Sequence, residues 1–265
     1  MDAVQNKGRT MTETEGLPTL SVTGHRATIR LNRPSVHNRI EPDDIVEMMR
    51  LFDLVDATHD IRVLVLAAGG KSFSSGFHIQ SIGTRADSTT AGFDAMTDRL
   101  ERVRVPSIAA LNGGVYGGST DMALSCDFRI GVHGMSMFMP AARLGLHYYP
   151  GGMQRYVSRL GVDTAKRLFL TAERLGAEEL LRIGFLTDLV APEALAATVE
   201  ARAAMIEANA PLAVQGMKLA LNDIARGDAN LTRIAERASA VAASADLQEG
   251  RQAWVEKRAP RFRGV

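Results

Sequence analysis

Two glycine-rich turns carry the strongest chemical signal in the sequence. The first spans residues 72–79 (SFSSGFHI) and the second spans residues 112–121 (NGGVYGGSTD). A backbone N–H at a glycine turn or at a helix start can bind an anion, because no side chain crowds its approach. Two such N–H groups that converge on one oxygen would form an oxyanion hole. Taken alone, either set of glycines could simply turn the chain.

Other catalytic motifs are absent from the sequence. The second turn has neither the Gly-Lys-Ser/Thr ending of a P-loop nor the GxGxxG spacing of a dinucleotide-binding turn. There is no GxSxG nucleophile elbow and no HExxH zinc motif. The six histidines show no metal-ligand spacing, and a single cysteine, Cys126, excludes multi-cysteine metal sites and intramolecular disulfides. We therefore expect no metal, and we expect Cys126 to be an inert buried thiol.

The apolar pattern predicts the elements that position the two turns. The runs at 63–66 (VLVL) and 107–111 (SIAAL) each precede one turn and are typical of strands buried on both faces. Residues 41–57 have the apolar spacing of an amphipathic helix. Strands separated by helices predict an α/β core with parallel pairing. Further strands are expected at 27–31, 128–131, 135–139 and 186–190, and helices at 93–103, 194–208, 211–225, 231–243 and 248–256.

Composition narrows the partners and the compartment. The 265 residues include 31 Lys and Arg against 30 Asp and Glu, so the formal net charge is +1. This balance gives no electrostatic reason to expect nucleic acid or an anionic membrane as partner. The first 17 residues are polar and lack the apolar segment of a secretory signal, and no run approaches the ~18–20 apolar residues of a membrane span. With one cysteine, a reducing compartment fits best, and we expect the cytoplasm.

Five sequence blocks together resemble the crotonase (enoyl-CoA hydratase/isomerase) superfamily. They are LNRP at 31–34, the two glycine turns, PGGMQR at 150–155 and EGRQAWVEKRAPRF at 249–262, in the order and at the separations of that family. The resemblance covers about residues 18–264. It implies an α/β spiral of ββα units over 18–195, after a flexible leader at 1–17. It also implies a helical C-terminal region at 196–265 that forms trimers, often paired into hexamers.

The resemblance also implies a ligand and a site. The substrate would be a coenzyme A thioester, with no separate cofactor, no nucleic acid and no membrane. The thioester carbonyl oxygen would accept hydrogen bonds from the N–H groups of Phe77 and Gly118. The family pattern assigns the remaining coenzyme A contacts to Arg33, Val36, His37, Phe77, His78, Ile79, Gln80, Gly118, Lys257 and Phe262. Of these, the last two would contact the nucleotide, in part from a neighbouring subunit.

The sequence departs from a hydratase at one acidic position. Hydratases of this family use two glutamates, of which the first aligns with Asp121 and the second aligns with Ala141. A positioned acid–base group contributes ~10²–10⁴-fold to a rate. We therefore expect weak or no ordinary hydratase activity. Asp121 remains the best candidate for acid–base chemistry.

Three neighbouring side chains could replace the missing glutamate. Tyr148, by its offset from Gly145, resembles the active-site tyrosine of methylmalonyl-CoA decarboxylase. Tyr149 aligns with an aspartate of dienoyl-CoA isomerases, and His147 is of a type that titrates near neutrality. Each could instead be a pocket wall or a surface residue.

The sequence thus predicts an acyl-CoA enzyme of the enoyl-CoA hydratase/isomerase class, a lyase or isomerase, placed in fatty acid metabolism. Its common step would be stabilisation of a thioester enolate. Decarboxylation or hydrolysis by the same fold remains open, because both need fewer carboxylates than hydration. A non-catalytic acyl-CoA-binding protein is the alternative from another class: Ala141 favours it, whereas Asp121 and Tyr148 favour the enzyme.

Overall fold

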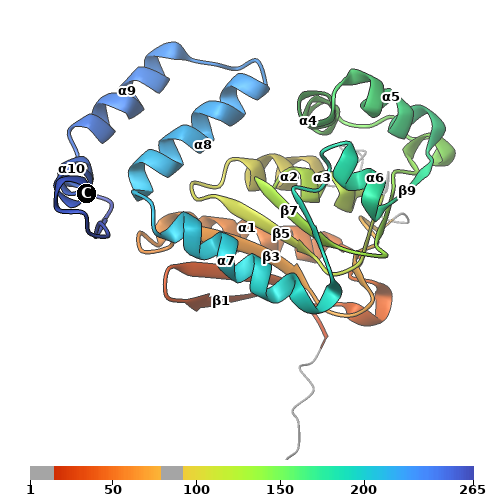
Figure 1. The fold of residues 1–265 in the computed structure, drawn as a ribbon. Coiled ribbons are helices and arrows are strands. Elements are labelled where there is room, and N and C mark those ends of the chain that lie inside the picture. The colour runs from red at the N-terminus through yellow and green to blue at the C-terminus, as the bar shows by residue number, and fades with distance from the viewer. Residues whose placement is uncertain (1–14, 79–91) are drawn as a thin grey trace, which may run out of the picture.

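The computed structural model describes residues 15–78 and 92–265. Its larger sheet has six strands in the order β1-β2-β3-β5-β7-β10 (Figure 1). β1 and β2 form an antiparallel hairpin, and every other neighbouring pair is parallel. The strands are β1 (Thr19–Thr23), β2 (Arg26–Leu31), β3 (Val63–Ala68), β5 (Ser107–Leu111), β7 (Phe128–Val132) and β10 (Asp188–Val190).

A second, smaller sheet contains β4, β6 and β8, which directly follow β3, β5 and β7 of the larger sheet. Its order is β4-β6-β8-β9, with β4, β6 and β8 parallel and β9 antiparallel. The strands are β4 (Ser72–Ser74), β6 (Gly114–Tyr116), β8 (Ser136–Phe138) and β9 (Arg174–Gly176). The chain alternates between the two sheets, so β3-β4, β5-β6 and β7-β8 are successive turns of one spiral. A helix follows each pair, which confirms the expected spiral of ββα units.

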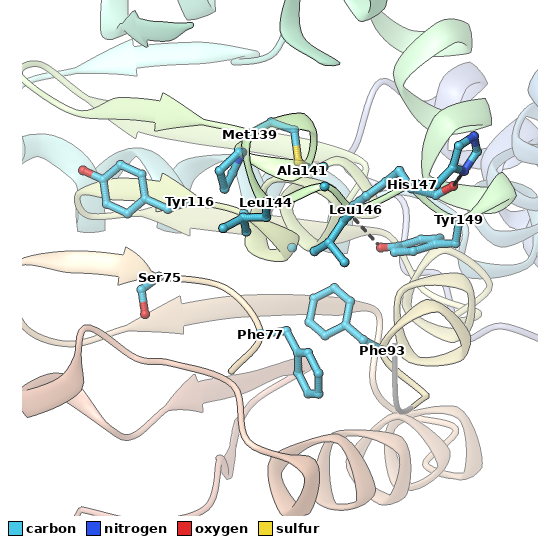
Figure 2. Close-up of a pocket in the computed structure, with 15 residues that line it drawn as sticks. Ser75, Phe77, Phe93, Tyr116, Met139, Ala141, Leu144, Leu146, His147 and Tyr149 are labelled. Atoms are coloured by element: carbon cyan, nitrogen blue, oxygen red, sulfur yellow. Dashed lines mark hydrogen bonds between the residues drawn. The ribbon is translucent and has the colours of Figure 1, made fainter. Parts of the chain in front are cut away.

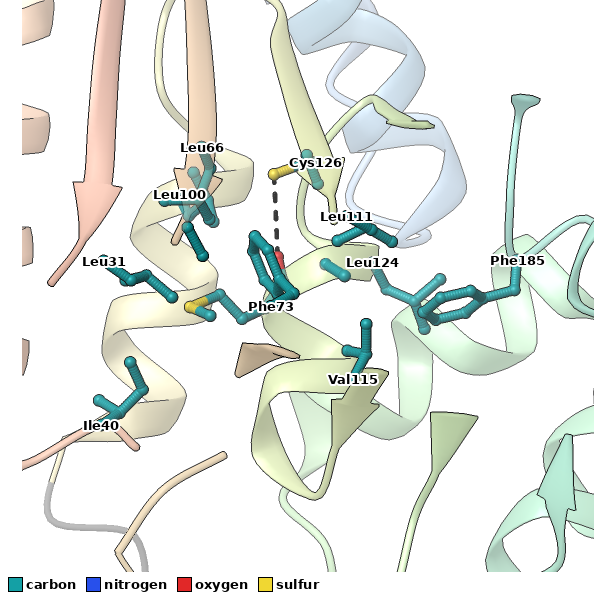
Figure 3. Packing of buried hydrophobic residues seen from close by; sticks show 14 of the residues in the cluster. Leu31, Ile40, Leu66, Phe73, Leu100, Leu111, Val115, Leu124, Cys126 and Phe185 are labelled. Atoms are coloured by element: carbon teal, nitrogen blue, oxygen red, sulfur yellow. Dashed lines mark hydrogen bonds between the residues drawn. The ribbon is translucent and has the colours of Figure 1, made fainter. Parts of the chain in front are cut away.

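The core lies between the two sheets. Phe73 of β4 and Val115 of β6 face Leu66 of β3 and Leu111 of β5, and all four side chains are fully buried (Figure 3). A second apolar cluster covers the other face of the large sheet, where Val63, Ile108 and Ile130 pack against α7 (Leu195–Glu207). The central strands are therefore buried on both faces, as their continuous apolar runs predict.

Helices α1 (Pro42–Ala57), α2 (Phe93–Glu101) and α3 (Gly118–Leu124) follow β2, β4 and β6. The start of α1 is set by a capping box, in which Glu41 and Asp44 each bond the other's backbone. Cys126 just after α3 is fully buried, and burial raises the pKa of its thiol to about 12, so it is an inert thiol at neutral pH (Figure 3).

The structure adds three helices that the sequence analysis does not anticipate: α4 (Pro150–Leu160), α5 (Val162–Thr171) and α6 (Ala177–Arg182). The C-terminal region forms α8 (Pro211–Ala225), α9 (Leu231–Ala242) and α10 (Ala245–Glu256), which extend away from the sheets (Figure 1). Large apolar side chains on this arm are exposed, among them Leu221 at 64%, Leu231 at 77% and Trp254 at 86%. In the described part of the chain, no helix is long and apolar enough to cross a membrane.

Candidate active site

The two glycine turns meet backbone to backbone. Gly76 has φ +90°, and a Cβ there would lie 2.5 Å from the carbonyl oxygen of Tyr116 and 2.9 Å from the backbone N of Gly118. Only glycine allows this approach and this conformation. The pairing of β4 with β6 brings together two segments that are about 40 residues apart in the chain. The residues after the two strands, Phe77 and Gly118, consequently lie beside each other.

Among the described residues, both turns leave a backbone donor without a protein acceptor. Residues 76 and 78 each bond to Ile40, so the intervening Phe77 N–H points away from that strand. Gly118 is the first residue of α3, and a helix has no internal acceptor for its first N–H groups. Within residues 15–78 and 92–265, neither the Phe77 N–H nor the Gly118 N–H donates a hydrogen bond. Two adjacent free donors are the arrangement that an oxyanion hole requires.

A cavity of about 290 Å³ opens beside these donors (Figure 2). One wall is aromatic and is formed by Phe77 and Phe93; the opposite wall comes from the segment after β8. The lining residues are Ser75, Phe77, Phe93, Tyr116, Gly117, Gly118, Met139, Pro140, Ala141, Leu144, Gly145, Leu146, His147, Tyr148 and Tyr149. None of these described lining residues carries a carboxylate. The cavity is mostly apolar, as small-molecule pockets usually are.

Asp121, the expected acid–base residue, lies behind the cavity wall. Its carboxylate is fully buried and accepts hydrogen bonds from Arg155 Nε at 2.8 Å and Arg155 Nη2 at 2.6 Å. The Tyr149 hydroxyl donates a third hydrogen bond to Oδ2 at 2.6 Å. Asp121 does not line the cavity, and Tyr149 stands between the two. Any action of this carboxylate on a ligand must therefore pass through Tyr149.

Tyr148 and Tyr149 both face the cavity and form a stacked pair. Their ring centroids are 4.3 Å apart, and the Tyr148 hydroxyl donates to the Tyr149 hydroxyl at 3.2 Å. Burial raises the pKa of both phenols well above the usual value, and the nearby charge of Asp121 raises it further. Both phenols are therefore neutral near pH 7. Two successive hydrogen bonds connect the Tyr148 hydroxyl through the Tyr149 hydroxyl to the Asp121 carboxylate.

Ala141 and His147 lie at different depths. Ala141 begins the short 3₁₀ helix η3 (Ala141–Leu144), is buried and lines the cavity, so its methyl group forms part of the cavity wall. His147 is exposed at the edge of the cavity, and its Nδ1 lies 2.8 Å from the backbone oxygen of Tyr148. It is the outermost of the candidate side chains.

Several expected coenzyme A contacts are engaged with the protein itself. Arg33 is paired with Asp44 at 2.9 Å, and His37 Nδ1 lies 3.0 Å from Ser72 Oγ. Val36 ends a 3₁₀ turn with its side chain 39% exposed. His78 Nδ1 lies 2.8 Å from Glu41 Oε2, so this side chain is also engaged with the protein beside the turn of Phe77. Two further expected contacts, Ile79 and Gln80, lie outside the described residues.

The last two expected contacts are distant from the cavity in this chain. Lys257 ends α10 in a left-handed conformation, with φ +54°, and is exposed. Phe262 lines a separate cavity on the helical arm together with Trp254. Figure 1 shows α10 on the far side of α8 from α4. Neither residue joins the glycine turns within one chain.

Two functional neighbours were not singled out from the sequence, Arg155 and Phe93. Arg155 is 1% exposed and holds Asp121, Asp98 and Glu101 together. Its place in the PGGMQR block is a signal, but the block alone does not show which carboxylates it binds. Phe93 is 2% exposed and its ring contacts Gly118 and the Phe77 ring, whereas its apolar spacing predicts only a buried helix face.

The chain folds as a spiral of ββα units, and two of its glycine turns present N–H groups that have no acceptor among the described residues to an apolar cavity. The chain matches the family described as Enoyl-CoA hydratase/isomerase over residues 24–265, and it belongs to this family, within the crotonase superfamily. It is 32% identical over 245 residues to the short-chain-enoyl-CoA hydratase of Clostridium acetobutylicum, which covers 89% of this chain and 93% of the relative. It is also 32% identical over 258 residues to the (E)-benzylidenesuccinyl-CoA hydratase of Thauera aromatica, covering 93% and 99% of the two chains.

Solved structures show the same fold. An enoyl-CoA hydratase from Bacillus anthracis superposes with a TM-score of 0.85 at 27% identity, covering 94% of this chain and all of the other. An enoyl-CoA hydratase subunit from Geobacillus kaustophilus gives a TM-score of 0.84 at 29% identity, covering 95% and 99%. The chain is thus an acyl-CoA-processing member of its family by both sequence and fold.

Proposed function

We propose that this protein stabilises the enolate of a coenzyme A thioester between the N–H groups of Phe77 and Gly118. One observation carries the proposal: the two turns abut, and both N–H groups lack a protein acceptor in the described residues. Negative charge that develops on the thioester oxygen would be met by both donors. One such donor is worth about 10²–10³ in rate.

Proton transfer would run through Tyr149. In the forward direction the substrate Cα–H bond breaks, the proton moves to the Tyr149 oxygen, and the Tyr149 proton moves to Asp121 Oδ2. The hydrogen bond of 2.6 Å between Tyr149 and Asp121 supports this path, as does the place of Tyr149 in the cavity wall. The reverse transfer returns a proton to the enolate. Asp121 acts through Tyr149, while Tyr148 holds the Tyr149 oxygen from the cavity side.

Ordinary hydration would be slow. Adding water across an enoyl thioester needs a group that orients and deprotonates water at Cβ, and the alanine at position 141 offers none. The loss of one acid–base group corresponds to ~10²–10⁴-fold. This deficit is what distinguishes the proposed enzyme from the hydratases that it resembles in sequence.

Decarboxylation is the second candidate, and the lining of the cavity favours it. Neutral phenols face the cavity, and none of the described lining residues is a carboxylate that could serve as a direct base. Loss of CO₂ from a 2-carboxyacyl thioester needs no base. The bond from Cα to the carboxylate breaks, its electron pair enters the enolate, Tyr149 then protonates Cα, and the Tyr149 oxygen regains a proton from solvent.

The exposed apolar side chains of the helical arm support a trimer or hexamer. Leu221, Ile224 and Leu231 lie on two packed helices, α8 and α9, and α9 buries none of its residues in one chain. Such apolar surface is characteristic of subunit interfaces. In an assembly, Lys257 and Phe262 of a neighbouring copy could reach the nucleotide. Light scattering at micromolar protein should give the mass of three or six chains, and a clean monomer would contradict this.

A turnover screen tests the function. Crotonyl-CoA, a 3-enoyl-CoA and methylmalonyl-CoA are assayed in parallel with calorimetric binding of each thioester. We expect micromolar binding, and hydration of crotonyl-CoA ~10²–10⁴-fold below that of a two-glutamate relative.

Ala141→Glu should recover part of the hydration rate. Absence of binding by any acyl-CoA up to millimolar concentration would remove the proposal, and binding without any turnover would leave an acyl-CoA-binding protein instead.

A further inference from the structure

The Phe93 ring packs against the Phe77 ring and against the backbone of Gly118. Phe93 is the first residue of α2, and its ring centroid is 5.7 Å from that of Phe77. A Cβ built on Gly118 would lie 2.9 Å from Phe93 Cε1, so the ring also packs directly on the start of α3. With 2% exposure, the side chain has no free surface beyond the cavity. Its position is therefore fixed beside the place where a thioester carbonyl would bind.

Phe93 narrows the cavity against two leucines. Figure 2 shows the Phe93 ring on one side of the cavity and Leu144 and Leu146 on the other, with Tyr149 beyond them. Leu146 is half-buried and packs on the main apolar core. An acyl chain that leaves the donors toward Tyr149 must pass between Phe93 and Leu146. These two side chains form the narrow part of the route.

The volume of the cavity limits what can pass. Its 290 Å³ corresponds to roughly ten groups the size of a water molecule. The thioester and the nearest atoms of the pantetheine arm would take part of this space. What is left holds an acyl group of about four to six heavy atoms. A longer straight chain that runs toward Tyr149 would have to pass Phe93.

Displacement of Phe93 is costly. Its helix packs its next apolar residues, Met96 and Leu100, into the core with no exposed surface, so the backbone that carries the ring is anchored. Interiors of this density respond to a change of even one methylene. Removing the ring would create space that is continuous with the cavity and open to a ligand.

We propose that Phe93 is the residue that sets the length of the acyl group, and that the natural substrates are thioesters of compact acyl groups. This inference rests on the proposed function, because it places the thioester at the Phe77 and Gly118 donors. It goes further in naming the substrate class and the side chain that selects it. Nothing in the reaction itself requires a ring at this position.

The experiment measures binding and needs no turnover. The dissociation constants of saturated straight-chain acyl-CoA esters, from acetyl-CoA to dodecanoyl-CoA, are measured by calorimetry for the wild type and for Phe93→Ala. The wild type should bind best at about four to six carbons and more weakly beyond. In Phe93→Ala the optimum should move to longer chains, with about fourfold tighter binding for each added methylene that enters the new space.

Two further variants keep the result interpretable. Phe185→Ala removes an equally buried ring that does not line the cavity, and it should leave the chain-length optimum unchanged. Leu146→Ala opens the opposite wall from a half-buried position, so it should shift the optimum even where Phe93→Ala fails to fold.

The outcomes separate the two proposals. If the wild type binds no acyl-CoA at all, the proposed function fails. If it binds them but neither Phe93→Ala nor Leu146→Ala changes the optimum, the function stands and the length-setting role is overturned. An equal shift in Phe185→Ala would also overturn that role, because the effect would then come from general loosening.

Discussion

The two ends of the cavity are built by different means. At the glycine end, Phe77 and Gly118 offer backbone N–H groups, and the side chains only shape the surroundings. At the tyrosine end, Tyr149 offers a side-chain hydroxyl whose direction depends on Asp121, and Asp121 depends in turn on Arg155. The first end is assembled by two turns of the spiral. The second end is assembled by a chain of polar contacts that crosses three helices, α2, α3 and α4.

This difference explains how each end can change. Backbone donors survive nearly any substitution of their own side chain, so a phenylalanine at position 77 can alter the shape of the pocket without removing the donor. A side-chain network is not tolerant in this way, because removing one member leaves a buried partner unsatisfied. We therefore expect the glycine end to be common to many acyl-CoA chemistries. The tyrosine end would decide which of them this protein performs.

The largest effect on activity is expected when the Tyr149 hydroxyl is removed at the tyrosine end. Tyr149→Phe removes the group between the cavity and Asp121 while it keeps the ring. The exchange of the α-hydrogens of butyryl-CoA with solvent deuterium should fall by ~10²–10⁴-fold, because the proton path is cut. The exchange is followed by mass spectrometry of the recovered thioester.

A matched control lies in the same cavity. Tyr116→Phe removes a phenol whose hydroxyl lies 3.2 Å from Ser136 Oγ and takes no part in the Asp121 network. It should leave exchange within a few fold of the wild type. If Tyr149→Phe and Tyr116→Phe both exchange the α-hydrogens of butyryl-CoA at the wild-type rate, Tyr149 lines the pocket and takes no part in proton transfer.

The sequence predicts the glycine end better than the tyrosine end. The runs before the two turns become β3 and β5, with the bounds of β5 as expected, and residues 211–225 become α8. Local pattern suffices there, because apolar runs and glycines specify strands and turns over a few residues. The proximity of the Phe77 and Gly118 N–H groups then follows from the way parallel strands place successive turns side by side.

The tyrosine end depends on contacts that local pattern cannot reveal. Arg155 binds Asp121, Asp98 and Glu101 across 34, 57 and 54 residues of sequence. Arg155 lies on α4, which begins with Pro-Gly-Gly. Because these residues have low helix propensity, the local sequence does not predict this helix. The sequence predicts Asp121 as the acid–base residue and Ala141 in place of a second glutamate. It does not show that the carboxylate is held behind Tyr149.

The next largest effect is a loss of stability when Arg155 is removed from the tyrosine end. Burial would lower the pKa of Arg155, but its hydrogen bonds to Asp121 outweigh this and raise the pKa, so the guanidinium stays charged. Arg155→Met would leave Asp121 fully buried with Tyr149 as its remaining partner. Removing one member of a buried ion pair costs about 3–5 kcal/mol in the free energy of unfolding. Urea denaturation at a fixed protein concentration measures it.

Removing the charge of Asp121 should lower the free energy of unfolding by less than removing Arg155 does. Asp121→Asn leaves Arg155 with two carboxylates, Asp98 and Glu101, so its charge stays compensated. At the glycine end, Ser75→Ala loses only a weak contact of 3.4 Å and should change stability by less than about 0.5 kcal/mol. Equal stabilities for Arg155→Met and the wild type would show that the network does not hold this end together.

At the glycine end, removal of a donor should reduce exchange less than Tyr149→Phe does. Gly118→Pro removes the N–H donor, and proline suits the first position of a helix, where Gly118 lies. Gly118→Ala keeps the N–H and adds a Cβ that meets the Phe93 ring at 2.9 Å, so it is the control for crowding. The ring is the flexible partner in that contact and can shift by a few tenths of an ångström. Exchange of butyryl-CoA should therefore fall by about 10²–10³ more in the proline variant than in the alanine variant. Equal losses in the two variants would mean that crowding, and not the missing donor, accounts for the effect, and the backbone would then not be what binds the thioester oxygen.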